Sequence, residues 1–126
     1  MDHKLKLMVV DDSPLFRTWL IRSLSEDDRF QVVGYAVNAL DAQEKIPLLQ
    51  PDMLTLDIEM PGMSGIDFLK QLLPVHPIPV ILVSSLNLRV FDALEAGAVD
   101  FVRKPDEANG LSKEIFLSIL RSKRMV

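Results

Sequence analysis

Five short, mainly apolar runs, separated by segments whose apolar residues have helical spacing, constrain the fold of this chain more than any other feature. The runs cover residues 5–10, 31–37, 53–57, 80–83 and 99–102. Strands buried on both faces read as continuous aliphatic runs, and strands that alternate with helices form parallel sheets. We therefore predict an α/β fold with one doubly wound parallel sheet, helices on both faces and right-handed crossovers.

Capping residues and prolines indicate where the first two helices begin and end. Ser13 as N-cap and Pro14 in the first turn predict a helix that runs to residue 25. Its expected inward stripe is Leu15, Trp19, Ile21 and Leu24. Asn38 predicts a second helix from residue 39, and Pro47 predicts that this helix ends or kinks near Lys45.

The remaining helices follow the same logic. Ser64 predicts the start of a third helix, and prolines 74, 77 and 79 predict an extended connection after it. Leu88, Phe91 and Leu94 are spaced as the inward stripe of a fourth helix that stops at Gly97. A last helix is expected over residues 111–123.

Length and composition are those of one globular domain. The chain has 126 residues, of which 48% are hydrophobic and 25% charged, with no cysteine and a formal charge of −4. No run is long enough to span a bilayer, and the N-terminus lacks the layout of a signal peptide. We expect a cytoplasmic protein that does not bind nucleic acid or membrane. The basic residues Arg121, Lys123 and Arg124 are explained as cations near a helix C-terminus.

Polar residues of complementary chemistry stand at the ends of four predicted strands. They are Asp11 and Asp12 after the first run, Asp57 at the end of the third, Ser84 and Ser85 after the fourth, and Lys104 after the fifth. In open parallel sheets, sites lie beyond the carboxyl ends of the strands. Three neighbouring acids repel unless positive charge balances them, so Lys104 and a hard divalent cation such as Mg²⁺ are expected there.

Taken singly, these residues also have plain structural explanations. Asp11, Asp12 or Ser13 could only cap the first helix, and Lys104 could be a solvated loop lysine. Asp57 is harder to explain in this way because it directly ends a buried run and lies near no cap. Complementary groups at four strand ends together favour a functional site.

Phosphoryl transfer to a carboxylate fits this combination of groups. A carboxylate can act as a covalent nucleophile, and the transferring group needs positioning, positive charge and hydrogen-bond donors. Asp57 would accept the group, and Ser84 and the backbone after Asp57 would donate to it. The Met-Pro-Gly segment 60–62 and Gly65 allow the chain to bend close to the acid, so a carbonyl near Glu59 can reach the metal.

Four motifs, in this order and spacing, resemble the receiver domain of bacterial two-component response regulators. They are VVDDS at 9–13, LDIEMPGMSG at 56–65, VSS at 83–85 and AGAVDFVRKP at 96–105. The resemblance covers nearly the whole chain and implies a single flavodoxin-like (βα)5 domain over 1–126 with strand order 2-1-3-4-5.

The resemblance also implies residue roles. Asp57 is then the phosphoacceptor, Ser84 the switch hydroxyl, Lys104 the phosphate-pairing lysine and Phe101 the aromatic switch residue. The Mg²⁺ ligands implied are Asp11 through water, Asp12, Asp57 and the backbone carbonyl of Glu59. The Lys104–Pro105 bond is expected to be cis. Phe101 could also be a core or surface packing residue.

Within the family, the sequence most resembles the receiver half of chemotaxis methylesterases. The segment 85–97 is shorter than in those proteins, Ser64 replaces a frequent acid, and Pro47 is unusual. The chain lacks a G-x-S-x-G motif, so we expect no independent enzyme in it. A methylesterase domain would follow Val126 if the chain is a fragment, and a stand-alone receiver is the alternative.

The leading hypothesis is a phosphorylation-controlled switch in chemotaxis or related two-component signalling. A sensor histidine kinase would donate the phosphoryl group, and an output domain or protein would bind the surface of the fourth helix, fifth strand and fifth helix. Two alternatives stay open. One is a phosphate-silent pseudo-receiver that acts as a binding module. The other is an aspartyl-phosphate hydrolase, for which the order of acids is a poor match.

Overall fold

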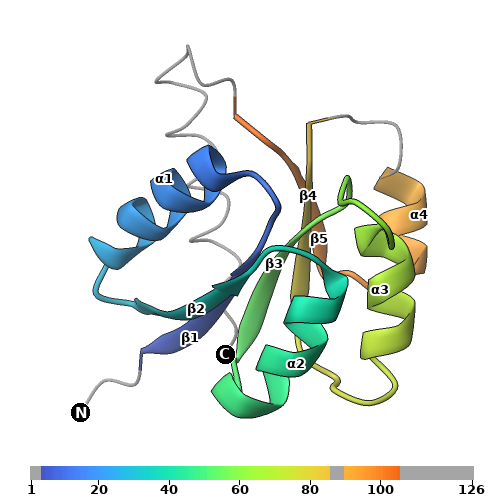
Figure 1. Cartoon of the computed structure of the whole chain (residues 1–126), viewed down its shortest axis with the longest axis horizontal. Coiled ribbons are helices and arrows are strands. Elements are labelled where there is room, and N and C mark those ends of the chain that lie inside the picture. The colour runs from blue at the N-terminus through green and yellow to red at the C-terminus, as the bar shows by residue number, and fades with distance from the viewer. Residues whose placement is uncertain (1–3, 86–89, 106–126) are drawn as a thin grey trace.

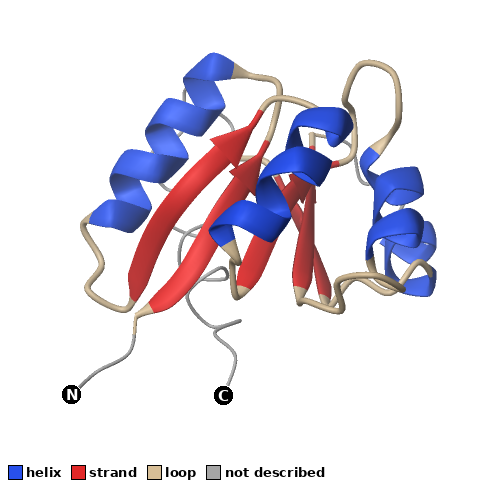
Figure 2. Cartoon of the chain, turned by 60° about the horizontal axis from the view of Figure 1, so that its bottom comes forward, coloured by secondary structure: helices blue, strands red, loops and turns tan. Residues whose placement is uncertain are grey.

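The fold is one five-stranded parallel sheet with helices on both faces, as the computed structural model of the chain shows (Figures 1 and 2). The structure describes residues 4–85 and 90–105. The strands are β1 (Leu5–Val10), β2 (Phe30–Ala36), β3 (Met53–Asp57), β4 (Val80–Ser84) and β5 (Asp100–Arg103), and the helices are α1 (Pro14–Ser25), α2 (Ala39–Leu49), α3 (Gly65–Leu72) and α4 (Val90–Glu95). The strand order is β2-β1-β3-β4-β5. The predicted α/β class and strand order are confirmed.

Alternating side chains of each strand build two separate cores, one on each face of the sheet. Met8, Leu54 and Leu82 face the core that α2, α3 and α4 cover. Their neighbours Leu7, Met53, Ile81 and Val83 face the core that α1 covers. Because successive side chains point to opposite faces, a strand that is buried on both sides must be apolar throughout. This is why the runs that form the central strands β1, β3 and β4 could be recognised most readily in the sequence.

Helix α1 begins and ends where predicted, and of its predicted inward stripe Leu24 is buried and Trp19 and Ile21 pack against the core, but Leu15 does not. The Ser13 hydroxyl accepts a hydrogen bond from the backbone N–H of Phe16, at 3.3 Å, and Phe16, Leu20 and Leu24 are buried. Leu15, predicted to face inward, is 73% exposed. One residue along a helix is a rotation of about 100°, so the i, i+4, i+8 stripe from Phe16 leaves Leu15 on the solvent side.

The predicted end of the second helix near Lys45 is wrong. Helix α2 continues through Pro47 to Leu49 and ends at Gln50, which has a left-handed φ of 49°. Ile46 is buried, and Leu49 packs against the core so closely that a Cβ on Gly34 would lie 2.7 Å from its Cδ1. This packing outweighs the backbone hydrogen bond that Pro47 cannot donate.

Helix α4 packs on the sheet through alanine and not through the predicted large side chains. Ala93 is fully buried, whereas Phe91 is 78% and Leu94 is 50% exposed. Because a helix presents only one face to the sheet, burial of Ala93 leaves Phe91 and Leu94 pointing toward solvent. Gly97 follows the helix with a φ of 104°, as expected for its end. Leu88 of the predicted stripe, the predicted helix 111–123 and the basic residues near the C-terminus lie outside the described residues.

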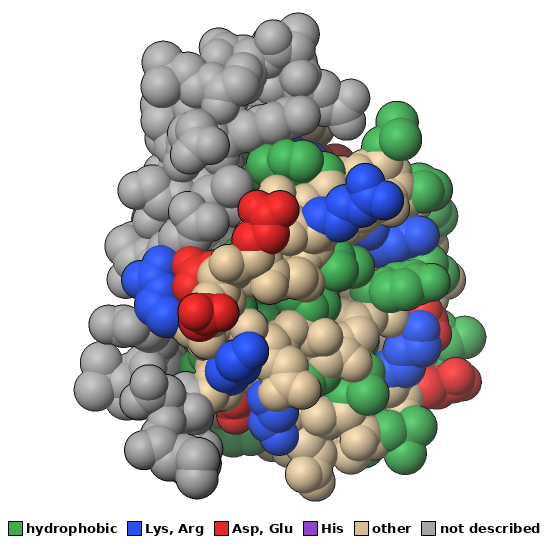
Figure 3. All heavy atoms as spheres, turned by 90° about the vertical axis from the view of Figure 1, so that its left-hand side faces the viewer, with side chains coloured by type: hydrophobic (Ala, Val, Ile, Leu, Met, Phe, Trp, Pro, Cys, Tyr) green, Lys and Arg blue, Asp and Glu red, His purple; other side chains and the backbone are tan. Residues whose placement is uncertain are grey.

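The surface over α1 and β2 carries charges of both signs. In Figure 3, which faces the α1 side of Figure 1, basic and acidic side chains are interspersed with apolar ones. The exposed apolar residues include Leu15, Tyr35 and Leu40. No helix in residues 4–85 and 90–105 is long and apolar enough to cross a membrane.

Candidate functional site

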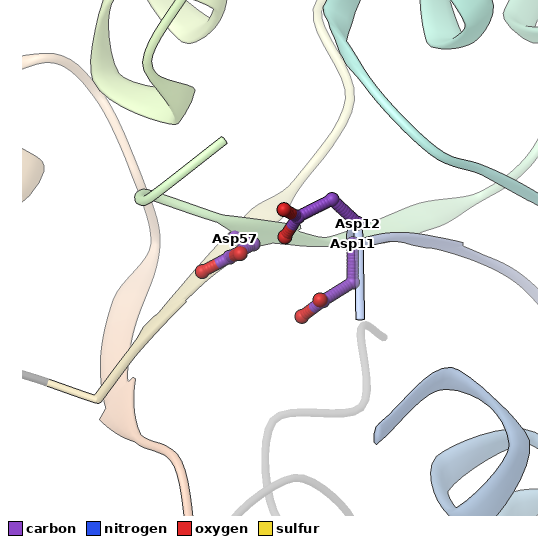
Figure 4. Close-up of side chains that lie close together, drawn as sticks. All are labelled: Asp11, Asp12 and Asp57. Atoms are coloured by element: carbon purple, nitrogen blue, oxygen red, sulfur yellow. The ribbon is translucent and has the colours of Figure 1, made fainter. Parts of the chain in front are cut away.

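Three aspartates from two neighbouring strands meet at the carboxyl edge of the sheet. Asp11 and Asp12 follow β1, and Asp57 ends β3 (Figure 4). The parallel register places Val10 beside Leu56, so the residues that follow each of them are also neighbours. Each aspartate offers a carboxylate oxygen, and these oxygens lie within 4.8 Å of one another. We call Asp11, Asp12 and Asp57 the acidic cluster.

Two members of the acidic cluster are buried, and their ionisation is unfavourable. Burial raises the pKa of Asp57 to about 7, with a further increase from the Asp11 carboxylate and a partial offset from Lys104. Burial also raises the pKa of Asp11, although Lys104 and the N–H of Ser13 oppose this. Asp12 is exposed. A buried carboxyl with a raised pKa is a frequent mark of a functional site.

Lys104 supplies the positive charge that faces the cluster. Its ammonium lies 2.9 Å from Asp11 Oδ2 and 3.6 Å from Asp57 Oδ2, and 4.6 Å from the centre of the Phe16 ring. The backbone N–H of Lys104 donates to the Ser84 carbonyl at 2.7 Å, which holds the residue at the end of the β4–β5 ladder. Burial acts to lower the pKa of Lys104, but the two buried carboxylates outweigh it and the pKa is raised.

The loop after Asp57 bends back onto its own strand. The N–H of Gly65 donates to the Ile58 carbonyl at 2.9 Å, and a Cβ on Gly65 would lie 2.2 Å from the Asp57 carbonyl oxygen. Only glycine fits so close to the backbone, which explains why Gly65 stands at the start of α3. The backbone N–H of Glu59 points to Asp57 Oδ1 at 3.3 Å. It is thus a hydrogen-bond donor beside the Asp57 carboxylate.

Ser84 is buried, and its hydroxyl donates a hydrogen bond to the side chain of Glu59, which was not predicted from the sequence. The Ser84 Oγ lies 2.7 Å and 2.6 Å from the two carboxylate oxygens of Glu59. Sequence reasoning assigned Glu59 a metal-binding backbone carbonyl and did not predict this hydrogen bond. The available signal was an acid two residues after the β3 aspartate, beside a strand that ends in two serines.

The resemblance predicted a cis peptide bond after Lys104 and a switch role for Phe101 on β5. The peptide bond between Lys104 and Pro105 is trans, so the cis bond that the resemblance implied is wrong. Trans is the lower-energy isomer of an X–Pro bond by about 0.5–1 kcal/mol. Phe101 is partly buried against the core under α2, α3 and α4.

The donor set of the acidic cluster suits a hard divalent cation. Three carboxylates face one lysine, and the buried Asp11 Oδ2 has that lysine as an ion-pair neighbour but receives no hydrogen bond of good geometry from the described residues. Such an oxygen is a ready ligand. Mg²⁺ prefers oxygen ligands, commonly one or two carboxylates, and retains several waters, which the exposed position of Asp12 allows.

Comparison with known proteins agrees with this geometry. The chain matches the response regulator receiver domain over residues 7–116. The chain belongs to the receiver domain family. Its curated relatives include a protein-glutamate methylesterase/protein-glutamine glutaminase 2 of Syntrophomonas wolfei, 49% identical over 94% of this chain and 35% of that protein. A second such enzyme, from Syntrophotalea carbinolica, is 50% identical over 88% of this chain and 33% of that protein.

Solved structures give the same result. The response regulator domain of Thermotoga maritima CheB is 37% identical, with a TM-score of 0.85 over 95% of this chain and 93% of that chain. CheY6 of R. sphaeroides, solved in complex with the P1 domain of CheA3, has a TM-score of 0.80 at 26% identity, over 95% of this chain and 97% of that chain. The chain is thus similar to receiver domains of chemotaxis proteins in both sequence and fold. It spans about a third of the length of the curated methylesterases that it matches.

Proposed function

We propose that Asp57 is the phosphoacceptor of a Mg²⁺-dependent signalling switch. The observation that carries this proposal is the position of the Asp57 carboxylate. It is buried at a strand end, 3.6 Å from the Lys104 ammonium and beside two further aspartates. This arrangement combines an anionic nucleophile with a fixed positive charge and a place for a cation. These are the groups that phosphoryl transfer to a carboxylate needs.

The transfer itself would be an exchange of bonds at phosphorus. An Asp57 oxygen forms the new P–O bond while the P–N bond of a phosphohistidine breaks, and the bond's electron pair leaves with the imidazole. Lys104 would balance charge on the transferring group, and the N–H of Glu59 would donate to it. Mg²⁺ held by Asp12 and Asp57, with Asp11 through water and the Glu59 carbonyl, would supply further positive charge.

The phosphorylated state would be transmitted through β4 and β5. Ser84 would turn its hydroxyl toward the phosphoryl group, and Phe101 on the next strand would change its packing. The output surface would include α4 and β5. Exposed apolar side chains support this choice: Phe91, Leu94 and Val99 lie there without cover from the described residues. The predicted fifth helix would complete the surface.

The relatives suggest the pathway and the partners. One similar receiver was solved in complex with the P1 domain of CheA3, so a histidine kinase of a chemotaxis system is the proposed phosphoryl donor. Residues 1–126 would form the receiver part of a cytoplasmic methylesterase, and a stand-alone receiver is the alternative. The match to the receiver domain family favours these two receiver hypotheses over the aspartyl-phosphate hydrolase hypothesis.

The test is phosphorylation by acetyl phosphate, followed by intact-mass spectrometry. We expect one phosphoryl increment that requires Mg²⁺ and is lost in Asp57→Asn. Asp28→Asn, which changes an exposed acid in the turn between α1 and β2, should behave as the parent. An increment that persists in Asp57→Asn would refute the assignment, and no increment on the parent protein would favour the phosphate-silent alternative.

A further inference from the structure

The side chain of Glu59 is held by hydrogen-bond donors at the end of β4. Its carboxylate oxygens accept from the Ser84 hydroxyl at 2.7 and 2.6 Å. The Oε1 atom also accepts from the Ser85 backbone N–H at 3.2 Å and from the Ser85 hydroxyl at 3.3 Å. We call this set of contacts the Glu59 bridge. It joins the loop after β3 to the end of β4.

The donors in the Glu59 bridge are of the kind that a phosphoryl group on Asp57 would need. Such a group would add negative oxygens at the carboxyl ends of β3 and β4, between Lys104 on one side and β4 on the other. The β3–β4 register pairs Asp57 with Val83, so Ser84 is one residue beyond the phosphoacceptor. Donors aimed at a carboxylate are equally suited to a phosphoryl group, because both are anions with several acceptor oxygens.

We propose that Glu59 is a positioning residue whose carboxylate stands in for the phosphoryl group and keeps Ser84 and Ser85 occupied until Asp57 is phosphorylated. The inference rests on the proposed function of Asp57. Phosphorylation would displace Glu59, and the released hydroxyl and N–H would turn to the new group. Glu59 itself is exposed, so its carboxylate can move into water at small cost. The bridge thus opposes the active arrangement without preventing it.

A simpler effect of Glu59 must be separated from this one. The negative charge of Glu59 repels any anion that binds near Asp57, whether or not the bridge exists. Glu59→Asp separates the two effects because it keeps the charge but shortens the side chain by one methylene, which withdraws the carboxylate from β4. Glu59→Gln does the reverse. It removes the charge and keeps the length, so its amide oxygen can still accept from Ser84.

The test is the affinity for beryllofluoride in the presence of Mg²⁺, measured through the fluorescence of the single tryptophan, Trp19. The Trp19 ring is 5.7 Å from Phe16, which lies against the Lys104 ammonium. If the bridge competes with the anion, Glu59→Asp should bind about tenfold more tightly than the parent, as expected for loss of a hydrogen bond to a charged group. Repulsion alone predicts tighter binding for Glu59→Gln and no change for Glu59→Asp.

A second readout needs neither anion nor metal. In two-dimensional amide NMR spectra of the unliganded protein, Glu59→Asp should shift the Ser85 amide proton resonance upfield, since the N–H loses its carboxylate partner. In a Ser84→Ala background, Glu59→Asp should give little gain in affinity, because the main donor is gone.

The outcomes distinguish the two proposals. If the parent binds beryllofluoride and Glu59→Asp changes neither its affinity nor the Ser85 resonance, the role of Glu59 is wrong and Asp57 keeps its own. If the parent binds no beryllofluoride at any Mg²⁺ concentration, the proposed function fails and the role of Glu59 fails with it.

Discussion

Replacing Asp57 with asparagine should stabilise the metal-free protein, by an amount that grows as the pH rises. Asparagine has the shape of a protonated aspartate but never ionises. In the folded protein burial raises the pKa of Asp57 to about 7, against 3.8 for an unperturbed aspartate. Each pKa unit corresponds to about 1.4 kcal/mol, so ionised Asp57 lowers the free energy of unfolding by up to about 4 kcal/mol.

The sign follows from which state binds the proton. The folded-state pKa is the higher one, so between about pH 4 and pH 7 the native protein binds more protons at this site than the unfolded chain. The stabilising contribution of protonation is present below the unfolded-state pKa and is lost as the pH rises through the folded-state pKa. The advantage of Asp57→Asn should therefore be about 2 kcal/mol near pH 5 and about 4 kcal/mol near pH 8.

The assay is urea denaturation near pH 5, 6.5 and 8 with a chelator present, monitored through Trp19 fluorescence. Asp28→Asn is the matched control and should leave the midpoint unchanged, because Asp28 is exposed. Adding Mg²⁺ should reduce the difference between parent and Asp57→Asn, since bound cation favours the ionised carboxylate. A variant that is no more stable than the parent near pH 8, or a gain that is the same at every pH, would show that this carboxyl is not strained by burial.

Three further predictions concern the lysine and the loops. Lys104→Met should destabilise the protein by roughly 3 kcal/mol at neutral pH, because it leaves two buried carboxylates without their cation; urea midpoints that fall equally near pH 5 would argue against this cause. Pro47→Ala should raise the free energy of unfolding by about 1–3 kcal/mol, since it restores a donor inside α2, and an unchanged or lower melting temperature would contradict this. Gly65→Ala should lower the free energy of unfolding by more than about 3 kcal/mol, because its Cβ would lie 2.2 Å from the Asp57 carbonyl oxygen. Gly62→Ala should lower it by about 1–2 kcal/mol, because a Cβ there would have nothing within 4 Å but the residue has a φ of 79°. Equal decreases in the melting temperatures of the two variants would refute the steric argument.

The fold and the location of the site could be predicted because both follow from backbone-level rules. A strand buried on both faces must be aliphatic, and its carboxyl end must lie at the sheet edge, so Asp11, Asp57 and Lys104 could be placed together without side-chain detail. The loop was also predictable, because Gly65 has a steric reason that glycine alone satisfies.

The features that sequence reasoning missed depend on packing between elements. Helical spacing identifies Leu94 as one of a stripe, but it does not say that Ala93 takes the buried side. Proline propensity argues against a helix through Pro47, but contacts of Ile46 and Leu49 decide otherwise. The bridge made by Glu59 depends on a side-chain rotamer that no residue spacing specifies.

The strand register has a consequence for which insertions and deletions this chain can accept. Neighbouring rungs of the ladders pair Asp57 with Val83 and Ser84 with Arg103, and Lys104 follows on the next position. Removing one residue from inside β3 would turn every later side chain of that strand to the opposite face, and Asp57 would no longer face Lys104. Insertions and deletions in related sequences should therefore be confined to the amino-terminal ends of the strands and to the loops that lead into them. The number of residues within β3, β4 and β5 should stay constant.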